Sequence, residues 1–224
     1  MYNEKLSDVD INGIKALYNP LKFYKIVNEF SSFFKCIDKN CDRWDDYTQN
    51  DYSVFSRFEM FNFEEYDKII YLDSDIIVNK SIDYLINECN DSECYAGPVQ
   101  DRPHFNAGVL VINKKTTFGE YKKRCVDILT QSENLYGNQP VFNKCFERTV
   151  TRFPQQYNLT VIHQHVKKLL ADDQVVILHF PGGPKPWSNG PKFSSYYLYA
   201  DESVRNKFLQ IWNHYADLYK KLYQ

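Results

Sequence analysis

The sequence predicts an α/β protein in which a twisted, mostly parallel sheet is flanked by helices. Short apolar runs typical of buried strands alternate along the chain with longer segments whose apolar residues recur at helical spacing. The links between these segments are short, and no repeat or low-complexity linker divides them. Because 224 residues suffice for one domain with a substantial core, we expect a single domain over residues 1–224.

The first half of the chain supplies the first helices and strands. Ser7 is placed to cap a helix, because its hydroxyl can accept a bond from a free backbone N–H of the first turn. That helix ends before Asn19-Pro20, since proline disfavours helix in the preceding residue. Apolar spacing predicts a strand at 23–27, a polar loop at 35–50, a helix at 52–63, a buried strand at 68–73 and its continuation at 76–78.

The second half continues the alternation of strands and helices. Ser81 is placed to cap a brief helix. Apolar runs predict strands at 95–98, 109–112 and 175–179, and helical spacing predicts helices at 117–131 and from Gly137 onward. From Asp201 to the end, apolar residues repeat at helical spacing, which predicts an amphipathic C-terminal helix.

Charge and composition exclude several classes of function. The net charge is −2 and the Lys and Arg residues are scattered, so we expect no nucleic-acid partner. No apolar run approaches the ~18 residues that a membrane span needs, and the residues after Met1 are polar. We therefore expect no membrane span, no signal peptide and a cytoplasmic location, with the six cysteines present as thiols.

Two pairs of cysteines share one spacing, which lies at the edge of that found in structural zinc sites. The pairs are Cys36/Cys41 and Cys89/Cys94. No glycine-rich knuckle accompanies either pair, so we interpret these residues as small, half-buried apolar groups. The alternative hypothesis is an unrelated α/β protein that uses them to bind structural zinc.

The strongest functional signal is a pair of acids at the end of the apolar run 68–72. Asp73 and Asp75 are separated by one residue, and side chains at i and i+2 of an extended chain point to the same face. Both can therefore direct oxygen ligands to one place beyond a buried strand, where open α/β sheets bind ligands. Such a pair suits Mg²⁺ or Mn²⁺ carrying a phosphate. Asp8 and Asp10 repeat the spacing without a preceding strand, and we interpret them as charges of a helix first turn.

Four further groups accompany the acid pair, and their order along the chain is more informative than any one of them. They are Arg57 on the helix before the strand, the small-residue turn and strand of Phe105–Val111, the helix start Gly137–Asn143, and the strand and Gly/Pro loop of Val176–Trp187.

With these motifs the sequence resembles the family 8 glycosyltransferases, which include glycogenin and bacterial galactosyltransferases. The resemblance extends from about Ser7 to Trp187 and is carried jointly by YLDSD, FNAGVLV, NQPVFN, YNL and HFPGGPKPW. It implies a single domain of the GT-A fold and a UDP-sugar donor, usually UDP-glucose or UDP-galactose. It also implies Mn²⁺ (or Mg²⁺) as cofactor and transfer of a hexose with retention of anomeric configuration to a saccharide or protein acceptor.

The resemblance assigns roles residue by residue. Asp73, Asp75 and His179 match the metal ligands of the family. Gln139 matches the glutamine beside the anomeric carbon, with Asn138 before it at the catalytic position. The residues expected at the donor are Arg57, Ser74, Asn106, Ala107, Gly108, Gly182 and Lys185.

Two features depart from the pattern of the family. The family begins with an apolar strand and helix that contact the nucleotide base, whereas residues 1–10 here are polar, so one interpretation is a chain truncated at the N-terminus relative to the family. The family usually carries Asp before the glutamine, where this chain has Asn138. Because Asn offers a dipole in place of a carboxylate, the alternative hypothesis is a catalytically weak or inactive sugar- or nucleotide-binding module. The sequence predicts neither the acceptor nor the oligomeric state.

Overall fold

The protein is represented by a computed structural model that describes residues 52–98, 103–131, 138–161, 174–181 and 202–222, together with Ser7, Asp8, Asn12, Lys15, Lys22 and Tyr24. The chain forms two compact units. Unit 1 comprises Met1–Tyr66 and Thr116–Cys145, and unit 2 comprises Asp67–Lys115 and Phe146–Gln224.

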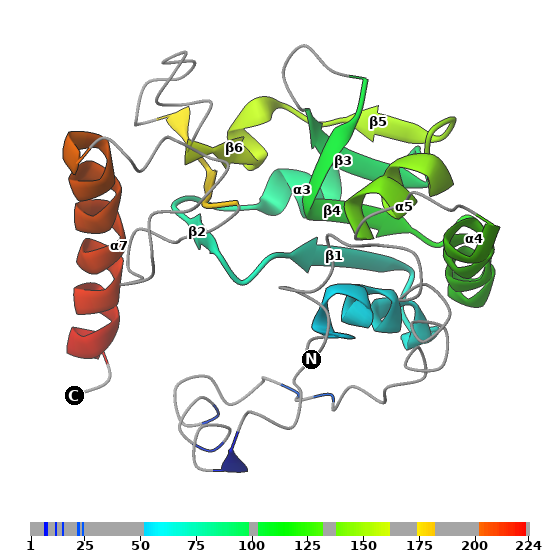
Figure 1. The fold of residues 1–224 in the computed structure, drawn as a ribbon, viewed down its shortest axis with the longest axis horizontal. Coiled ribbons are helices and arrows are strands. Elements are labelled where there is room, and N and C mark those ends of the chain that lie inside the picture. The colour runs from blue at the N-terminus through cyan, green and yellow to red at the C-terminus, as the bar shows by residue number, and fades with distance from the viewer. Residues whose placement is uncertain are drawn as a thin grey trace, which may run out of the picture. The chain divides into compact units, whose positions relative to one another are not determined.

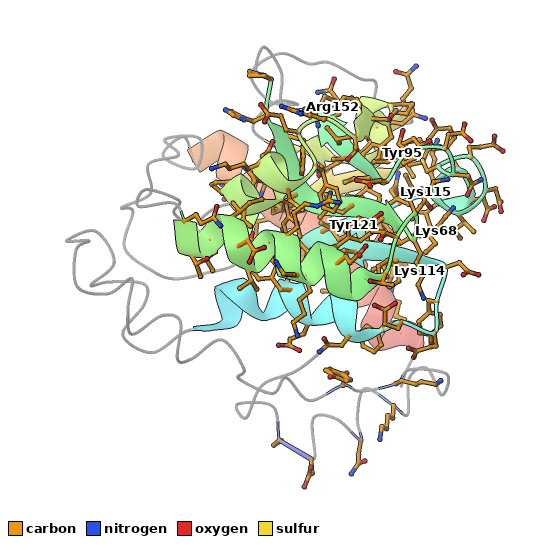
Figure 2. All side chains as sticks on the ribbon, turned by 90° about the vertical axis from the view of Figure 1, so that its right-hand side faces the viewer. Lys68, Tyr95, Lys114, Lys115, Tyr121 and Arg152 are labelled. Atoms are coloured by element: carbon orange, nitrogen blue, oxygen red, sulfur yellow. The ribbon has the colours of Figure 1, made fainter. Side chains whose placement is uncertain are left out.

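Unit 1 contains helices that pack through aromatic rings. They are η2 (Tyr52–Asn62), α4 (Phe118–Gln131) and α5 (Asn138–Cys145). The ring of Phe61 on η2 lies 6.0 Å from that of Tyr121 on α4 and 6.3 Å from that of Phe142 on α5, and all three rings are buried. Figure 2 labels Tyr121 on its helix. Burial of such large rings stabilises the packing of these helices.

The helix predicted at 52–63 is present, but as a 3₁₀-helix. Phe58 and Phe61 are three residues apart and both are completely buried. Three residues complete one turn of a 3₁₀-helix, so this spacing places both rings on the same face. The aromatic spacing thus matches the tighter helix.

Unit 2 contains a four-stranded sheet in the order β1-β4-β3-β5 (Figure 1). The strands are β1 (Lys68–Leu72), β3 (Cys94–Pro98), β4 (Phe105–Asn113) and β5 (Val150–Arg152). β4 pairs antiparallel with β1 and β3, and β5 pairs parallel with β3. Lys68, labelled in Figure 2, donates from Nζ to Asn90 Oδ1 (2.6 Å) and to Ile86 O, which joins the start of β1 to the segment before β3.

A three-stranded sheet in the order β2-β7-β6 completes the strands described in unit 2. These strands are β2 (Ile76–Val78), β6 (Leu159–Thr160) and β7 (Ile177–His179). β7 pairs antiparallel with β2 and parallel with β6. The helices of unit 2 whose bounds fall within the described residues are α3 (Asp83–Asn87), η3 (Gln155–Tyr157) and α7 (Glu202–Leu222).

The C-terminal helix α7 covers part of the core beside β7. Three of its residues, Ile211, Trp212 and Tyr215, pack against a buried cluster that includes Phe180. The rings of Trp212 and Phe180 meet edge to face with centroids 5.7 Å apart. The predicted amphipathic helix is therefore confirmed, and it packs next to the strand that carries His179.

The prediction of a mostly parallel sheet is wrong for the described strands. Three of their pairings are antiparallel and two are parallel. The prediction came from the alternation of strands and helices with short links, which is typical of parallel sheets. In the structure all residues of β4 except Asn106 are buried, although both of its neighbours run antiparallel to it. The apolar run of β4 therefore indicates that the strand is buried, but it does not indicate the direction of the neighbouring strands.

Most of the other predicted elements are confirmed within a few residues. The Ser81 hydroxyl accepts from the Asp83 N–H at 3.1 Å, but Ser81 precedes the N-cap position of α3, which is Ile82. Asp8, Asn12 and Lys15 have helical backbone, in agreement with a helix after Ser7. β5, β6 and η3, each of two or three residues, were not predicted, since patterns so short carry no period. Within the described ranges, no helix combines the length and apolarity that crossing a membrane requires.

Several predicted features lie outside the described residues. They are Gly182 and Lys185 of the Gly/Pro loop, Cys36 and Cys41, the loop at 35–50, and all but Tyr24 of the strand expected at 23–27.

Candidate metal centre

The segment between β1 and β2 carries the acid pair. It consists of Asp73, Ser74 and Asp75, and it is held at both ends by neighbouring strands. The Asp73 N–H donates to Gly108 O in β4 (2.8 Å), and the N–H of Phe180, which follows β7, donates to Asp75 O (2.9 Å). Both carboxylates therefore stand on backbone fixed to the two sheets of unit 2.

His179 joins the two acids, as the resemblance predicts. It is the last residue of β7 and pairs with Ile76 of β2, the residue directly after Asp75. Its Nε2 lies 3.5 Å from Asp73 Oδ2 and 3.4 Å from Asp75 Oδ1. One ligand atom from each of the three residues lies within 4.8 Å of the other two. Segments more than a hundred positions apart thus bring two oxygens and one nitrogen to the same place.

The electrostatics of this group favour a cation. The side chain of His179 is 2% exposed, and its Nε2 is buried without a hydrogen-bond partner in the described part of the chain. Burial lowers the pKa of His179, but the carboxylates of Asp73 and Asp75 outweigh it and raise that pKa above its ordinary value. A buried nitrogen without a hydrogen bond, facing two carboxylates, fits a divalent ion with hard or borderline preference such as Mn²⁺ or Mg²⁺.

Two residues that were not predicted from the sequence form hydrogen bonds with Asp73 and His179, at atoms other than the two that face each other. The Tyr71 hydroxyl donates to Asp73 Oδ1 at 2.8 Å, and Asn158 Oδ1 lies 3.0 Å from His179 Nδ1. Tyr71 was detectable, because it stands two residues before Asp73 and so on the same face of the strand. Asn158 belongs to the YNL motif, but its contact with His179 spans 21 residues and follows no local period.

Asn106, Ala107 and Gly108 form the start of β4 and not the turn that their small side chains suggested. A Cβ added to Gly108 would lie 2.7 Å from His179 Nδ1, closer than packed atoms allow. Gly108 therefore leaves room for the His179 imidazole. The close approach of the imidazole to the backbone, and not a chain reversal, explains why a glycine occupies this position.

Three other predicted site residues that the structure describes lie in unit 1, and a fourth, in unit 2, is exposed. Asn138 and Gln139 are the first residues of α5, and Asn138 is buried; the Gln139 carbonyl accepts from Asn143 Nδ2 at 2.9 Å. Arg57 lies on η2 with a half-buried side chain, and Ser74 of unit 2 is exposed. The structure thus gathers Asp73, Asp75 and His179 with the start of β4.

The sequence profile described as Glycosyl transferase family 8 matches residues 6–190. The chain belongs to glycosyl transferase family 8. This overturns the hypothesis of an unrelated zinc protein. In addition, Cys89 and Cys94 are both buried, and neither joins a group of three metal-binding side chains among the described residues.

Relatives of this family 8 chain include bacterial and plant glycosyltransferases. It is 29% identical over 183 residues to glycosyltransferase GlyD of Streptococcus pneumoniae serotype 4, covering 74% of the chain and 21% of GlyD. It is 30% identical over 151 residues to GlyE of the same strain, covering 60% of the chain and 37% of GlyE. Galactinol synthase 5 of Arabidopsis thaliana is 27% identical over 199 residues, covering 73% of the chain and 58% of that enzyme. The chain therefore spans only part of each of these relatives.

Solved structures show that the family 8 chain has a GT-A-like α/β fold with mixed sheets. The galactosyltransferase LgtC, solved with donor and acceptor sugar analogues, superposes with a TM-score of 0.61 at 18% identity, covering 90% of this chain and 81% of LgtC. GlyE of S. pneumoniae TIGR4 superposes with a TM-score of 0.54 at 23% identity, covering 70% of this chain and 46% of GlyE.

Proposed function

We propose that this family 8 chain is a metal-dependent retaining hexosyltransferase that moves glucose or galactose from its UDP derivative to a saccharide or protein acceptor. The observation that carries the proposal is the meeting of Asp73, Asp75 and His179, with ligand atoms within 4.8 Å of one another. Mn²⁺, or Mg²⁺ in its place, is the ion we assign to them. The GT-A-like fold and the family membership support a nucleotide-sugar donor.

The residues of the centre divide the work of holding and orienting the ion. Asp73 and Asp75 supply anionic oxygens, and a neutral His179 supplies a nitrogen lone pair at Nε2. Tyr71 holds one oxygen of Asp73 by a hydrogen bond, which leaves Oδ2 on the side of His179. A bound ion would offset the negative charge that builds on the leaving UDP. At the diphosphate, we assign Lys185 as a further positive charge and Gly182 as a point of close backbone approach, both from the match to the family motif.

The replacement of Asp by Asn138 bears on how the sugar is transferred. A carboxylate near the anomeric carbon could stabilise oxocarbenium charge or act as a nucleophile, whereas the Asn138 amide offers only a dipole. We therefore propose a front-face transfer in which Gln139 and the phosphate of the donor orient the acceptor, and not a double displacement through position 138.

Asn138 also supports a second candidate, a sugar- or nucleotide-binding module with weak or no turnover. The two candidates share the metal centre and the donor, and they differ in whether bound donor is consumed. Restoring the acid with Asn138→Asp would not rescue activity in a module that lacks turnover for other reasons.

A donor screen for UDP release, with and without Mn²⁺, tests the transferase. We expect UDP release from UDP-glucose or UDP-galactose only when the metal is present, and its loss in Asp73→Ala and Asp75→Ala. Asp83→Ala is the matched control, because Asp83 is an exposed acid of α3 in the same unit. Saturable donor binding without UDP release would favour the binding module. Metal-independent release that survives both substitutions would overturn the proposed role of the centre.

A further inference from the structure

Asn158 is a buried amide that joins the two sheets of unit 2 beside the metal centre. It is 2% exposed, follows η3 and precedes β6, and its backbone N–H donates to Gln155 O at 3.1 Å. Its side chain contacts His179 of β7 at one end and Asn106 of β4 at the other. A buried amide with partners at both ends is held in one orientation.

The orientation of these amides follows from one backbone donor. The Gly108 N–H can only donate, and it lies 2.9 Å from Asn106 Oδ1, so the atom in that place must be the amide oxygen. The Asn158 atom that lies 2.9 Å from the same oxygen must then be a donor, which makes it Nδ2. The Asn158 atom that lies 3.0 Å from His179 is consequently Oδ1, an acceptor.

This assignment fixes the proton on the imidazole. Because Asn158 Oδ1 accepts, His179 Nδ1 must carry the hydrogen, and the lone pair of a neutral ring is left on Nε2. The negative oxygens of Asp73 and Asp75 lie 3.5 Å and 3.4 Å from Nε2, and by themselves they would favour a proton on that nitrogen and so the opposite tautomer. Asn158 and the two acids therefore compete for the tautomer, and only the Asn158 form presents a lone pair to a metal.

Steric evidence independent of the hydrogen bonds shows that space is kept for this arrangement. A Cβ added to Gly97 in β3 would lie 2.6 Å from Asn158 Cβ and 2.7 Å from its Nδ2. A Cβ added to Gly108 would lie 2.7 Å from His179 Nδ1 and 2.9 Å from Asn106 Oδ1. The absence of a side chain at Gly97 and at Gly108 thus leaves the space that the Asn158 amide and the His179 imidazole occupy.

We propose that Asn158 is a positioning residue that fixes His179 as the Nδ1–H tautomer and so presents Nε2 as a ligand for the metal. The inference rests on the proposed function in that it deepens the metal centre. Asn158 itself is assigned no contact with metal or donor. Asn106 holds Asn158 by a hydrogen bond, Gly97 leaves room for the Asn158 side chain, and Gly108 leaves room for the ring.

The direct test is the tautomer of His179 in the metal-free wild-type protein. The protein is labelled with ¹⁵N-histidine and measured by two-bond ¹H–¹⁵N correlation at alkaline pH with EDTA present, where the ring is neutral. His179→Gln identifies the signals that belong to His179. We expect hydrogen on Nδ1 in spite of the two carboxylates at Nε2, and a predominantly Nε2–H ring would overturn the inference.

Two substitutions separate positioning from mere packing. Asn158→Leu removes the acceptor at similar volume, and we expect the ring to change to the Nε2–H tautomer and Mn²⁺ to bind about 10- to 100-fold more weakly. Asn158→Asp keeps the acceptor, so it should keep the Nδ1–H tautomer and bind Mn²⁺ more tightly than Asn158→Leu. Asn87→Leu, an exposed change of the same chemistry on α3, is the matched control. An unchanged tautomer in folded Asn158→Leu would contradict the proposal.

The outcomes for the inference and for the proposed function are distinct. If wild-type protein binds no Mn²⁺, as followed by the electron paramagnetic resonance of the free ion, the proposed metal dependence fails. The tautomer measurement contains no metal and still decides the role of Asn158.

Discussion

At the scale of single residues, the centre depends on hydrogen bonds that aim its ligands. Tyr71 donates to one oxygen of Asp73, which leaves the other oxygen 3.5 Å from His179 Nε2. Removing a residue that hydrogen-bonds to a metal ligand usually weakens metal binding strongly. It lowers the stability of the fold little, because the ligand itself remains.

Tyr71→Phe should therefore weaken Mn²⁺ binding about tenfold while lowering the free energy of unfolding by only about 1 kcal/mol. Calorimetric Mn²⁺ titration and urea unfolding measure the two effects. Tyr66→Phe, which removes a hydroxyl from an exposed ring, is the control. Equal Mn²⁺ affinity in Tyr71→Phe and wild type would show that the hydroxyl does not orient Asp73.

The raised pKa of His179 gives metal binding and metal-free stability opposite dependences on pH. Without metal, the charged ring stabilises the fold fully below the unfolded pKa of about 6.5, and this contribution is lost as pH rises through the higher folded pKa. Metal requires the neutral ring, so Mn²⁺ affinity should rise with pH over the same window.

Thermal unfolding measures both trends when wild type is compared with His179→Gln. In EDTA, the stability advantage of wild type should shrink as pH increases above about 6.5, and in saturating Mn²⁺ it should grow. Parallel trends in the two buffers would contradict this assignment of the proton and the metal to one nitrogen.

At the scale of elements, the centre relies on strand ends and on the helix behind them. α7 places Trp212 against Phe180, the residue after His179, with ring centroids 5.7 Å apart. Phe180 also donates its N–H to Asp75 O. The packing of α7 on Phe180 therefore supports the backbone of Asp75 and of His179, the residue before Phe180.

Trp212→Ala should lower the free energy of unfolding by about 2 kcal/mol, below the range for a fully buried ring because Trp212 is only partly buried. It should also weaken Mn²⁺ binding through the loosened end of β7. Differential scanning calorimetry and Mn²⁺ titration test these expectations together. Leu218→Ala on the exposed face of α7 is the control, and a wild-type unfolding temperature in Trp212→Ala would contradict the proposed docking.

Sequence reasoning predicted what depends on local spacing. The period of two placed Asp73 and Asp75 together, and the helical period placed α7. His179 came from the family motif, because no local rule connects it to residues a hundred positions away. Asn158 was missed for the same reason, since its amide reaches Asn106 across 52 residues. The prediction of strand direction was wrong at β4, because a strand buried on both faces has the same apolar sequence whether its neighbours run parallel or antiparallel.

At the scale of the whole molecule, the proposed work is divided between the two units. Asp73, Asp75 and His179 lie in unit 2, whereas Asn138 and Gln139 begin α5 of unit 1. Because every candidate metal ligand among the described residues belongs to unit 2, we expect that mutation can separate metal binding from the proposed sugar transfer.

Gln139→Ala should lower the rate of sugar transfer about 100-fold, the scale of one lost polar contact at a reacting centre, while Mn²⁺ affinity stays at the wild-type value. UDP release and Mn²⁺ titration provide the two readouts. Gln210→Ala, an exposed position on α7, is the control. A loss of Mn²⁺ binding in Gln139→Ala would show that the division of roles is wrong.

A titration of the metal-free protein with Mn²⁺, followed by electron paramagnetic resonance, tests most directly whether Asp73, Asp75 and His179 form one cation site. We predict a single saturable ion per chain that is lost in Asp75→Ala and in His179→Gln and is retained in Asp83→Ala. Absence of saturable binding in wild type, or binding that survives substitution of these ligands, would contradict the account.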